Sequence, residues 1–195
     1  MSVLLIAGSP SERSRSTALL DRVGRLLSQR DVAIDRLQVR DLSSQALLLA
    51  DFSHRTVVEA LHQVDRAQAI VVATPVYKAA YSGVLKMLLD LLPQSAFKGK
   101  TVLPLATGGS PHHMLALDYA LRPVLQSLGA RHILPGVYAT DAQVALTPEQ
   151  GYVIQPETEA RLEESAAALY AEGLRGRSAT PVLEPIAFSR VRCSV

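Results

Sequence analysis

A segment rich in hydroxyl groups joins an early apolar run to the first stretch of helical periodicity. It contains five hydroxyl side chains and two arginines: Ser9, Ser11, Arg13, Ser14, Arg15, Ser16 and Thr17. A helix that begins in this segment directs unpaired N–H groups and the positive end of its dipole toward the loop. These donors together suit a phosphate monoester. Ser and Thr are also common helix caps, so a solvated cap is the competing interpretation.

Two later segments contain residue types that suit a flat heterocycle. In one of them Pro75, Val76 and Tyr77 directly follow an apolar run, with Lys78 next to them. The other follows a further apolar run and consists of Thr107, Gly108, Gly109 and Ser110. Because glycine lets the backbone approach a ligand closely, N–H groups here can meet the polar pyrimidine edge of a flavin. Ordinary packing of the tyrosine and a tight turn at the glycines are the alternatives.

Three other patterns suggest chemistry that their surroundings do not support. The run 99–101 resembles the end of a P-loop, but Gln94 stands where the upstream glycine belongs and a strand pattern follows. His112 and His113 are adjacent, so on a helix they point about 100° apart and cannot share a metal. The Gly-x-Ser-x-Gly pattern of hydrolases is absent around Ser110, because residue 112 is histidine. We therefore predict no metal site and no hydrolase nucleophile.

The segments described above lie between predicted strands and helices, because apolar runs alternate along the chain with stretches of helical periodicity. Apolar runs predict five strands, at 3–7, 32–39, 69–73, 101–106 and, in broken form, 132–138. Apolar residues at helical spacing predict five helices, within 19–27, 57–64, 84–92, 117–128 and 156–170. Strands that alternate with helices indicate an α/β protein, with a parallel sheet covered by helices on both faces.

The predicted fold is a flavodoxin-like three-layer sandwich around a five-stranded parallel sheet with the order 2-1-3-4-5. Ligands of such sheets bind beyond the carboxyl ends of the strands. The three unusual segments follow the first, third and fourth strands, so this fold brings them to one edge. We assign residues 1–174 to this domain. Residues 175–195 show no periodicity and contain two prolines, so we expect an irregular C-terminal tail.

Composition excludes several classes of protein. A length of 195 residues with 48% hydrophobic and 19% charged residues indicates one globular domain. The net charge is only +2 and the basic residues are dispersed, which argues against a nucleic-acid surface. Cys193 is the single cysteine, which excludes an internal disulfide. With neither a secretory leader nor a long apolar segment, the expected location is the cytoplasm, away from any membrane.

Four stretches resemble a known enzyme family. Residues 72–83, 88–93, 103–109 and 117–123 are similar to the NADPH-dependent FMN reductases of two-component alkanesulfonate monooxygenase systems. The similarity extends from residue 3 to about residue 144. Thr-Pro-Val-Tyr and Ala-Thr-Gly-Gly occur across a wider flavin reductase superfamily, whereas Lys-Ala-Ala-Tyr-Ser-Gly and Asp-Tyr-Ala-Leu are more specific.

The resemblance implies hydride transfer from NADPH to FMN, with flavin held by the three loops. The cofactor-binding residues are then Ser9, Ser14, Arg15, Ser16, Pro75, Val76, Tyr77, Lys78, Thr107, Gly108, Gly109 and Ser110. The family often has arginine where this chain has Ser11, so the cation for the FMN phosphate is Arg13 or Arg15. The Ser-Arg-Ser context favours Arg15. Lys78 and Arg13 are candidates for the 2′-phosphate of NADPH.

Tyr119 is the candidate catalytic residue. The resemblance implies a one-residue insertion here, forming a π-bulge at a subunit interface near the flavin. Independently, Pro123 has no N–H for the carbonyl of Tyr119, which weakens the helix at this point. A simple proline kink is the alternative. Since hydride transfer between cofactors needs no acid or base side chain, we assign no such role to His112, His113 or Asp118.

The resemblance further implies a homotetramer that passes reduced FMN to a partner monooxygenase, so that flavin acts as a substrate as much as a bound cofactor. Two alternatives share the fold. One is a reductase that retains FMN and acts on quinones or azo compounds, and the other is a non-enzymatic flavodoxin-type electron carrier. Such carriers tend to be strongly acidic, unlike this chain with its net charge of +2.

Overall fold

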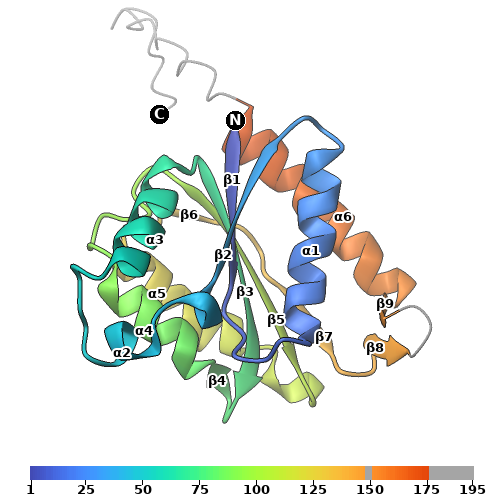
Figure 1. Cartoon of the computed structure of the whole chain (residues 1–195). Helices are drawn as coiled ribbons and strands as arrows, with labels where there is room; N and C mark the ends of the chain where they lie inside the picture. The colour runs from blue at the N-terminus through green and yellow to red at the C-terminus, as the bar shows by residue number, and fades with distance from the viewer. Residues whose placement is uncertain (148–150, 176–195) are drawn as a thin grey trace, which may run out of the picture.

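A mostly parallel sheet lies between two layers of helices in the computed structural model, which describes residues 1–147 and 151–175 (Figure 1). Its centre consists of β1 (Ser2–Ala7), β3 (Ala69–Tyr77) and β5 (Thr101–Gly108). At one edge lies β2 (Ala33–Gln38), and at the other lie β6 (His132–Ile133) and β7 (Val137–Thr140). All of β5 and the first six residues of β3 are buried, as expected for strands covered on both faces.

The order β2-β1-β3-β5-β6 corresponds to the predicted 2-1-3-4-5, and the flavodoxin-like fold is confirmed. The predicted number of strands is wrong, because the sheet has seven. One addition is β4 (Ala80–Tyr81), which pairs antiparallel with the end of β3. The other arises because the broken fifth strand forms two separate pieces, β6 and β7, that both pair with β5. Pro135 lies between the pieces and has no N–H to donate to the ladder.

The five helices that the periodicity predicts are present and cover the two faces of the sheet (Figure 1). On one face lie α1 (Arg15–Ser28) and α6 (Pro156–Leu169). On the other lie α3 (Arg55–Arg66), α4 (Gly83–Leu91) and α5 (Arg122–Ser127). The apolar positions of the first helical pattern are its buried face in α1: Leu19, Leu20, Val23, Leu26 and Leu27.

Local sequence explains where these helices begin. At α1 the Ser14 hydroxyl accepts a hydrogen bond from the Thr17 N–H, and at α4 the Ser82 hydroxyl accepts one from the Leu85 N–H. The first residue of α6 is Pro156, whose missing N–H is no loss at this position. The Arg22 side chain forms ion pairs with Glu159 and Glu163, which connects α1 to α6.

The run 99–101 is a turn that leads into a strand, as predicted. Gly99 has a φ of 77°, and β5 begins at Thr101. The Lys100 ammonium group donates to the carbonyl oxygens of Asp65 at 2.9 Å and Ala67 at 2.6 Å. Burial lowers the pKa of Lys100 from its ordinary value. This lysine therefore holds the end of α3 against the sheet, at the edge opposite the three loops.

Several short elements escape the sequence patterns. They are α2 (Ser44–Leu48), the 3-10 turns η1 (Val39–Asp41) and η2 (Pro111–His113), the π-helix η4 (Tyr170–Leu174), and a hairpin of β8 (Val144–Thr147) and β9 (Gly151–Ile154). The π-helix η3 (Leu117–Leu121), by contrast, lies within the helix predicted at 117–128. The hairpin stands beside the beginning of α1 (Figure 1).

The described elements end with η4 at Leu174. The predicted irregular tail, 175–195, lies outside the described residues except for Arg175, so its boundary stays a prediction. Among the helices of residues 1–147 and 151–175, none is both long and apolar enough to cross a membrane.

Candidate active site

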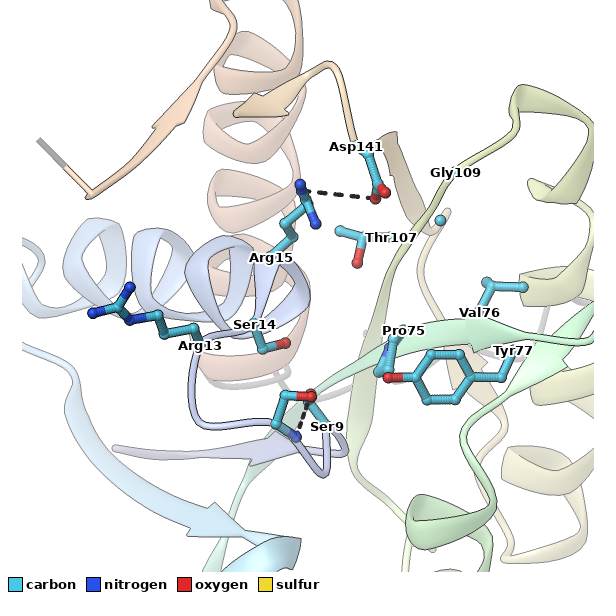
Figure 2. Close-up of a pocket in the computed structure, with 12 residues that line it drawn as sticks. Ser9, Arg13, Ser14, Arg15, Pro75, Val76, Tyr77, Thr107, Gly109 and Asp141 are labelled. Atoms are coloured by element: carbon cyan, nitrogen blue, oxygen red, sulfur yellow. Dashed lines mark hydrogen bonds and ion pairs between the residues drawn. The ribbon is translucent and has the colours of Figure 1, made fainter. Parts of the chain in front are cut away.

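The three loops meet at the carboxyl edge of the sheet and surround a cleft of about 200 Å³ (Figure 2). Sheet register brings them together, because Pro75 pairs with Thr107 and the last residue of β1, Ala7, pairs with Ala73. The predicted cofactor-binding residues that border this cleft are Ser9, Ser14, Arg15, Pro75, Val76, Tyr77, Thr107, Gly108 and Gly109. Ser11, Arg13 and Asp141 complete its border.

Three predicted cofactor-binding residues lie outside the border of the cleft. Ser16 is buried, with its hydroxyl 2.9 Å from that of Ser14. Ser110 caps η2, where its hydroxyl accepts from the His112 N–H at 3.3 Å. Lys78 is exposed at the turn between β3 and β4, with a φ of 50°. Ser16 thus contacts Ser14 at the border of the cleft, Ser110 stabilises the start of η2, and Lys78 is exposed to solvent at the hairpin.

The first loop presents hydrogen-bond donors at the start of α1. The Ser9 hydroxyl is buried and accepts from the Ser11 N–H at 3.2 Å. In the part of the chain that the structure describes, the N–H groups of Arg15 and Ser16 have no protein acceptor. Helix-start N–H groups without a partner are suited to an anion. The loop therefore has the donors that its composition predicts.

The two arginines of this loop differ in their surroundings. Arg15 Nε donates to the Val144 carbonyl oxygen at 3.0 Å and lies 3.7 Å from Asp141 Oδ1. Its guanidinium group is thus held over the cleft between α1 and the strand end at β7. Arg13 points away from the other side chains of the cleft (Figure 2) and has no hydrogen-bond or ion-pair partner among the described residues.

Ser82 joins the first loop to the second. Its buried hydroxyl donates to the Gly8 carbonyl oxygen and accepts from the Leu85 N–H at 3.1 Å. Its own N–H donates to Thr74 Oγ1 at 2.9 Å. Gly8 in turn donates its N–H to the Ala73 carbonyl oxygen at 2.8 Å. One serine therefore fixes the spacing of two walls of the cleft.

The two glycines of the third loop have different surroundings. A Cβ on Gly108 would lie 2.7 Å from Tyr138 Oη, which leaves no room for a side chain. A Cβ on Gly109 would meet nothing nearer than Asp141 Oδ2, at 3.9 Å. Tyr138 donates its hydroxyl to the Ser110 carbonyl oxygen at 2.5 Å. Burial, with a smaller contribution from Asp141, raises the pKa of Tyr138, which keeps this donor protonated at neutral pH.

The helix at Tyr119 is irregular, as its sequence context predicts. At the end of η3 the Arg122 N–H donates to the Leu117 carbonyl oxygen, five residues earlier, which is the π-helical pattern. Arg122 also forms an ion pair with Asp118 at 3.0 Å. The Tyr119 side chain is 79% exposed and does not border this cleft.

Comparison with known proteins identifies the family. A family model described as NADPH-dependent FMN reductase matches residues 1–148. The chain belongs to this family. It is 52% identical over 145 residues to FMN reductase (NADPH) of Pseudomonas putida, covering 74% of each chain. The FMN reductase (NADPH) of Escherichia coli is 49% identical over 144 residues, which cover 74% of this chain and 75% of that one. The protein is accordingly an oxidoreductase that uses FMN and NADPH.

A solved structure supports the same assignment. The apo form of an NADH:FMN oxidoreductase (EMOB) superposes with a TM-score of 0.81 and 38% sequence identity, covering 91% of this chain and 92% of that chain. The superposition therefore covers more of the chain than residues 1–148, which the family model matches.

The cleft residues fit FMN in two respects. The unpaired N–H groups of Arg15 and Ser16 offer donors for its phosphate, as a helix start does for anions in general. The open space at Gly109 offers room for a ring beside the third loop. Tyr77 and Pro75 present an apolar wall across from it (Figure 2).

Sequence reasoning missed Asp141, Ser82 and Tyr138 as parts of the site. Asp141 follows the last strand piece, β7, at the same sheet edge as the other loops. The rule that ligands bind beyond strand carboxyl ends could have found it, had the fifth strand been included. Ser82 and Tyr138 act through long-range hydrogen bonds, which a local pattern does not reveal.

Proposed function

We propose that this FMN reductase releases reduced FMN to a separate monooxygenase of the alkanesulfonate type, so that flavin is a substrate rather than a permanent cofactor. The size of the cleft carries this proposal. At about 200 Å³ it is smaller than most ligand pockets, which have volumes of roughly 300 to 1,000 Å³. A protomer that encloses only part of its flavin favours exchange over retention.

Each wall of the cleft has a proposed task. Bound FMN supplies the hydride acceptor and NADPH the hydride. Ser9, Ser14 and the first N–H groups of α1 hold the phosphate, with Arg15 above it. The backbone from Thr107 to Ser110 aligns the ring and presents N–H dipoles to it, while Tyr77 covers its other side. None of these tasks requires a proton donor or acceptor among the side chains.

We further propose that the reductase is a homotetramer in the cytoplasm. Exposed apolar side chains gather near the cleft at the end of β3 and around η3, which contacts β4: Tyr77, Met114, Leu115 and Tyr119. Apolar groups of this size rarely cluster on the surface of a monomer. A neighbouring subunit seated there would bring its own Tyr119 close to a flavin. The lone Cys193 offers no internal disulfide of the kind that stabilises exported proteins.

Turnover of free flavin tests the proposal. With FMN in large molar excess over enzyme under anaerobic conditions, NADPH consumption should equal the amount of added FMN. An FMN-retaining reductase would stop after reducing its bound flavin unless a quinone or azo compound were added, and a carrier would not consume NADPH. Adding the monooxygenase with an alkanesulfonate and oxygen should then yield sulfite in proportion to NADPH. A stoichiometry limited to one flavin per subunit would contradict the release mechanism.

A further inference from the structure

A second cleft, of about 410 Å³, adjoins the flavin cleft on the far side of the first loop. Arg13 and Ser14 border both clefts. The floor of the second cleft is α1, from Thr17 to Arg25, and its opposite wall is β9, with Tyr152 and Ile154. A ligand that extends out of the flavin cleft past Ser14 therefore enters this second cleft.

Two arginines at this cleft have no partner within residues 1–147 and 151–175. Neither Arg13 nor Arg25 forms a hydrogen bond or ion pair through its side chain with any described residue, and both are exposed. The neighbouring arginines of α1 are engaged, Arg15 with Val144 and Asp141 and Arg22 with two glutamates of α6. The cleft thus has two guanidinium groups available to an anion.

The acidic groups at the cleft reduce this positive charge only in part. Asp21 forms an ion pair with Arg36 of β2, so its charge is already compensated. Glu12 is exposed beside Arg13 and has no partner among the residues that the structure describes. An incoming phosphate dianion meets Arg13 and Arg25 against a single free carboxylate.

We propose that this cleft binds the adenosine 2′-phosphate end of NADPH, with Arg13 and Arg25 holding the 2′-phosphate and the Tyr152 ring lying against the adenine. This proposal depends on the placement of the flavin in the adjoining cleft. It makes Arg25 a residue that determines coenzyme specificity, since NADH lacks the 2′-phosphate.

The chemistry of the two coenzymes supports this assignment. A phosphate monoester carries a charge of about −1.5 to −2 at neutral pH. Guanidinium groups match its geometry with paired N–H donors and are the usual partners of the 2′-phosphate in NADP-binding folds. An aromatic ring offers a face on which a base can stack. The half-buried Tyr152 on β9 is in position for that contact.

The structure favours Arg13 over Lys78 for this role. Lys78 is exposed at the β3–β4 turn and borders neither cleft. Arg13 is directed away from the flavin cleft (Figure 2), and the phosphate of FMN has Arg15 as its cation. In this arrangement Arg15 binds the FMN phosphate and Arg13 binds the 2′-phosphate of NADPH.

Calorimetric titration of the purified full chain with adenosine 2′,5′-bisphosphate and with 5′-AMP tests the site without depending on turnover. The principal variant is Arg25→Ala, because Arg25 borders only the second cleft. Loss of one charge-assisted hydrogen bond should lower the affinity for the bisphosphate by roughly tenfold to a hundredfold. The affinity for 5′-AMP should stay within about twofold of the wild-type value. Arg25→Lys should recover part of the loss, and Arg55→Ala, an exposed arginine of α3, serves as the charge-matched control.

Steady-state kinetics complete the test. The ratio of kcat/KM with NADPH to kcat/KM with NADH should fall about tenfold or more in Arg25→Ala and further in the double variant with Arg13→Ala. It should stay at the wild-type value in Arg55→Ala. Failure of wild-type enzyme to bind the bisphosphate, or equal binding by wild type and the double variant, would overturn the assignment. Either result would leave FMN release untouched, because excess-flavin turnover with NADH measures that separately.

Discussion

At the scale of single residues, the first loop shows how similar side chains two positions apart acquire different tasks. Arg15 contacts Asp141 and the Val144 carbonyl oxygen, whereas Arg13 points away from the cleft and has no side-chain partner among the described residues. The start of α1 separates the two side chains, because Ser14 caps the helix, Arg15 is its first residue and Arg13 lies in the loop before the cap. The sequence predicts both cations and favours Arg15 for the FMN phosphate, but it does not reveal the contacts to Val144 and Asp141 that hold Arg15 in place.

Arg15→Ala should lower the affinity for FMN about tenfold. It should lower the affinity for riboflavin, which lacks the phosphate, by less than about twofold. The reason is the loss of a charge-assisted contact to a phosphate, moderated by the partial exposure of Arg15. Fluorescence titration with both flavins measures the difference. Asp141→Asn is a useful companion, because removal of the competing carboxylate should strengthen FMN binding. Equal weakening of both flavins by Arg15→Ala would mean that this arginine does not face the phosphate.

Gly109→Val should lower FMN affinity by at least about tenfold while the melting temperature stays within a few degrees of wild type. The added side chain meets no protein atom closer than 3.9 Å at its Cβ, so it projects into space proposed for the ring. Gly108→Val is the contrasting variant, because its Cβ would collide with Tyr138 and should destabilise the fold itself. Flavin titration and thermal unfolding of both variants check this. Normal FMN affinity in Gly109→Val would remove the third loop from the site.

At the scale of secondary-structure elements, predictability follows burial. Strands β1, β3 and β5 are continuous apolar runs because both of their faces are covered, and the sequence reveals them directly. The hairpin β8–β9 is half exposed and four residues per strand, so its pattern is too short and too mixed to stand out. The five residues of α2 likewise provide little helical period, and Leu48 there is exposed.

The irregular helix η3 was visible in the sequence for a specific reason. Pro123 has no N–H to donate to the carbonyl of Tyr119. In the structure, the preceding N–H, that of Arg122, donates to the Leu117 carbonyl oxygen in the π-helical pattern. A local sequence feature thus predicts a local irregularity. The orientation of Tyr119 toward solvent depends on what packs against η3, and a single chain does not determine that.

Tyr119→Ala should change how much flavin stays with the enzyme and how quickly reduced flavin is transferred, with little effect on folding. Because the side chain is 79% exposed, its removal costs almost no buried contact within the protomer. The flavin-to-protein ratio after purification and NADPH oxidation with excess FMN measure the two effects. Leu48→Ala, which removes an apolar side chain that is 74% exposed, is the matched control. If both quantities equal the wild-type values, Tyr119 has no part in flavin transfer.

At the scale of the whole molecule, the two helical layers differ in how many large apolar side chains they expose. Ion pairs between Arg22 and two glutamates connect α1 to α6, and neither helix has a large apolar side chain among the exposed ones of the described residues. The opposite layer leaves large apolar side chains exposed near the proposed flavin site, among them Met114 and Leu115 on the segment before η3. The fold could be predicted because it depends on the pattern within one chain, whereas assembly depends on how such surfaces match between copies.

Leu115→Asp should dissociate the proposed tetramer into smaller species and weaken FMN binding at the same time. A carboxylate buried at an apolar subunit contact costs several kcal/mol, by order of magnitude, when it has no partner. Since Leu115 is 52% exposed in the protomer, the fold of each subunit should persist, which circular dichroism can establish. Light scattering coupled to size-exclusion chromatography gives the mass. Leu146→Asp, which changes an exposed apolar side chain on β8 at the α1 and α6 face of the sheet, provides the control and should remain tetrameric with normal FMN affinity. A wild-type mass that is already monomeric would contradict the tetramer. A dissociated Leu115→Asp variant with unchanged flavin affinity would show that the neighbouring subunit contributes nothing to the site.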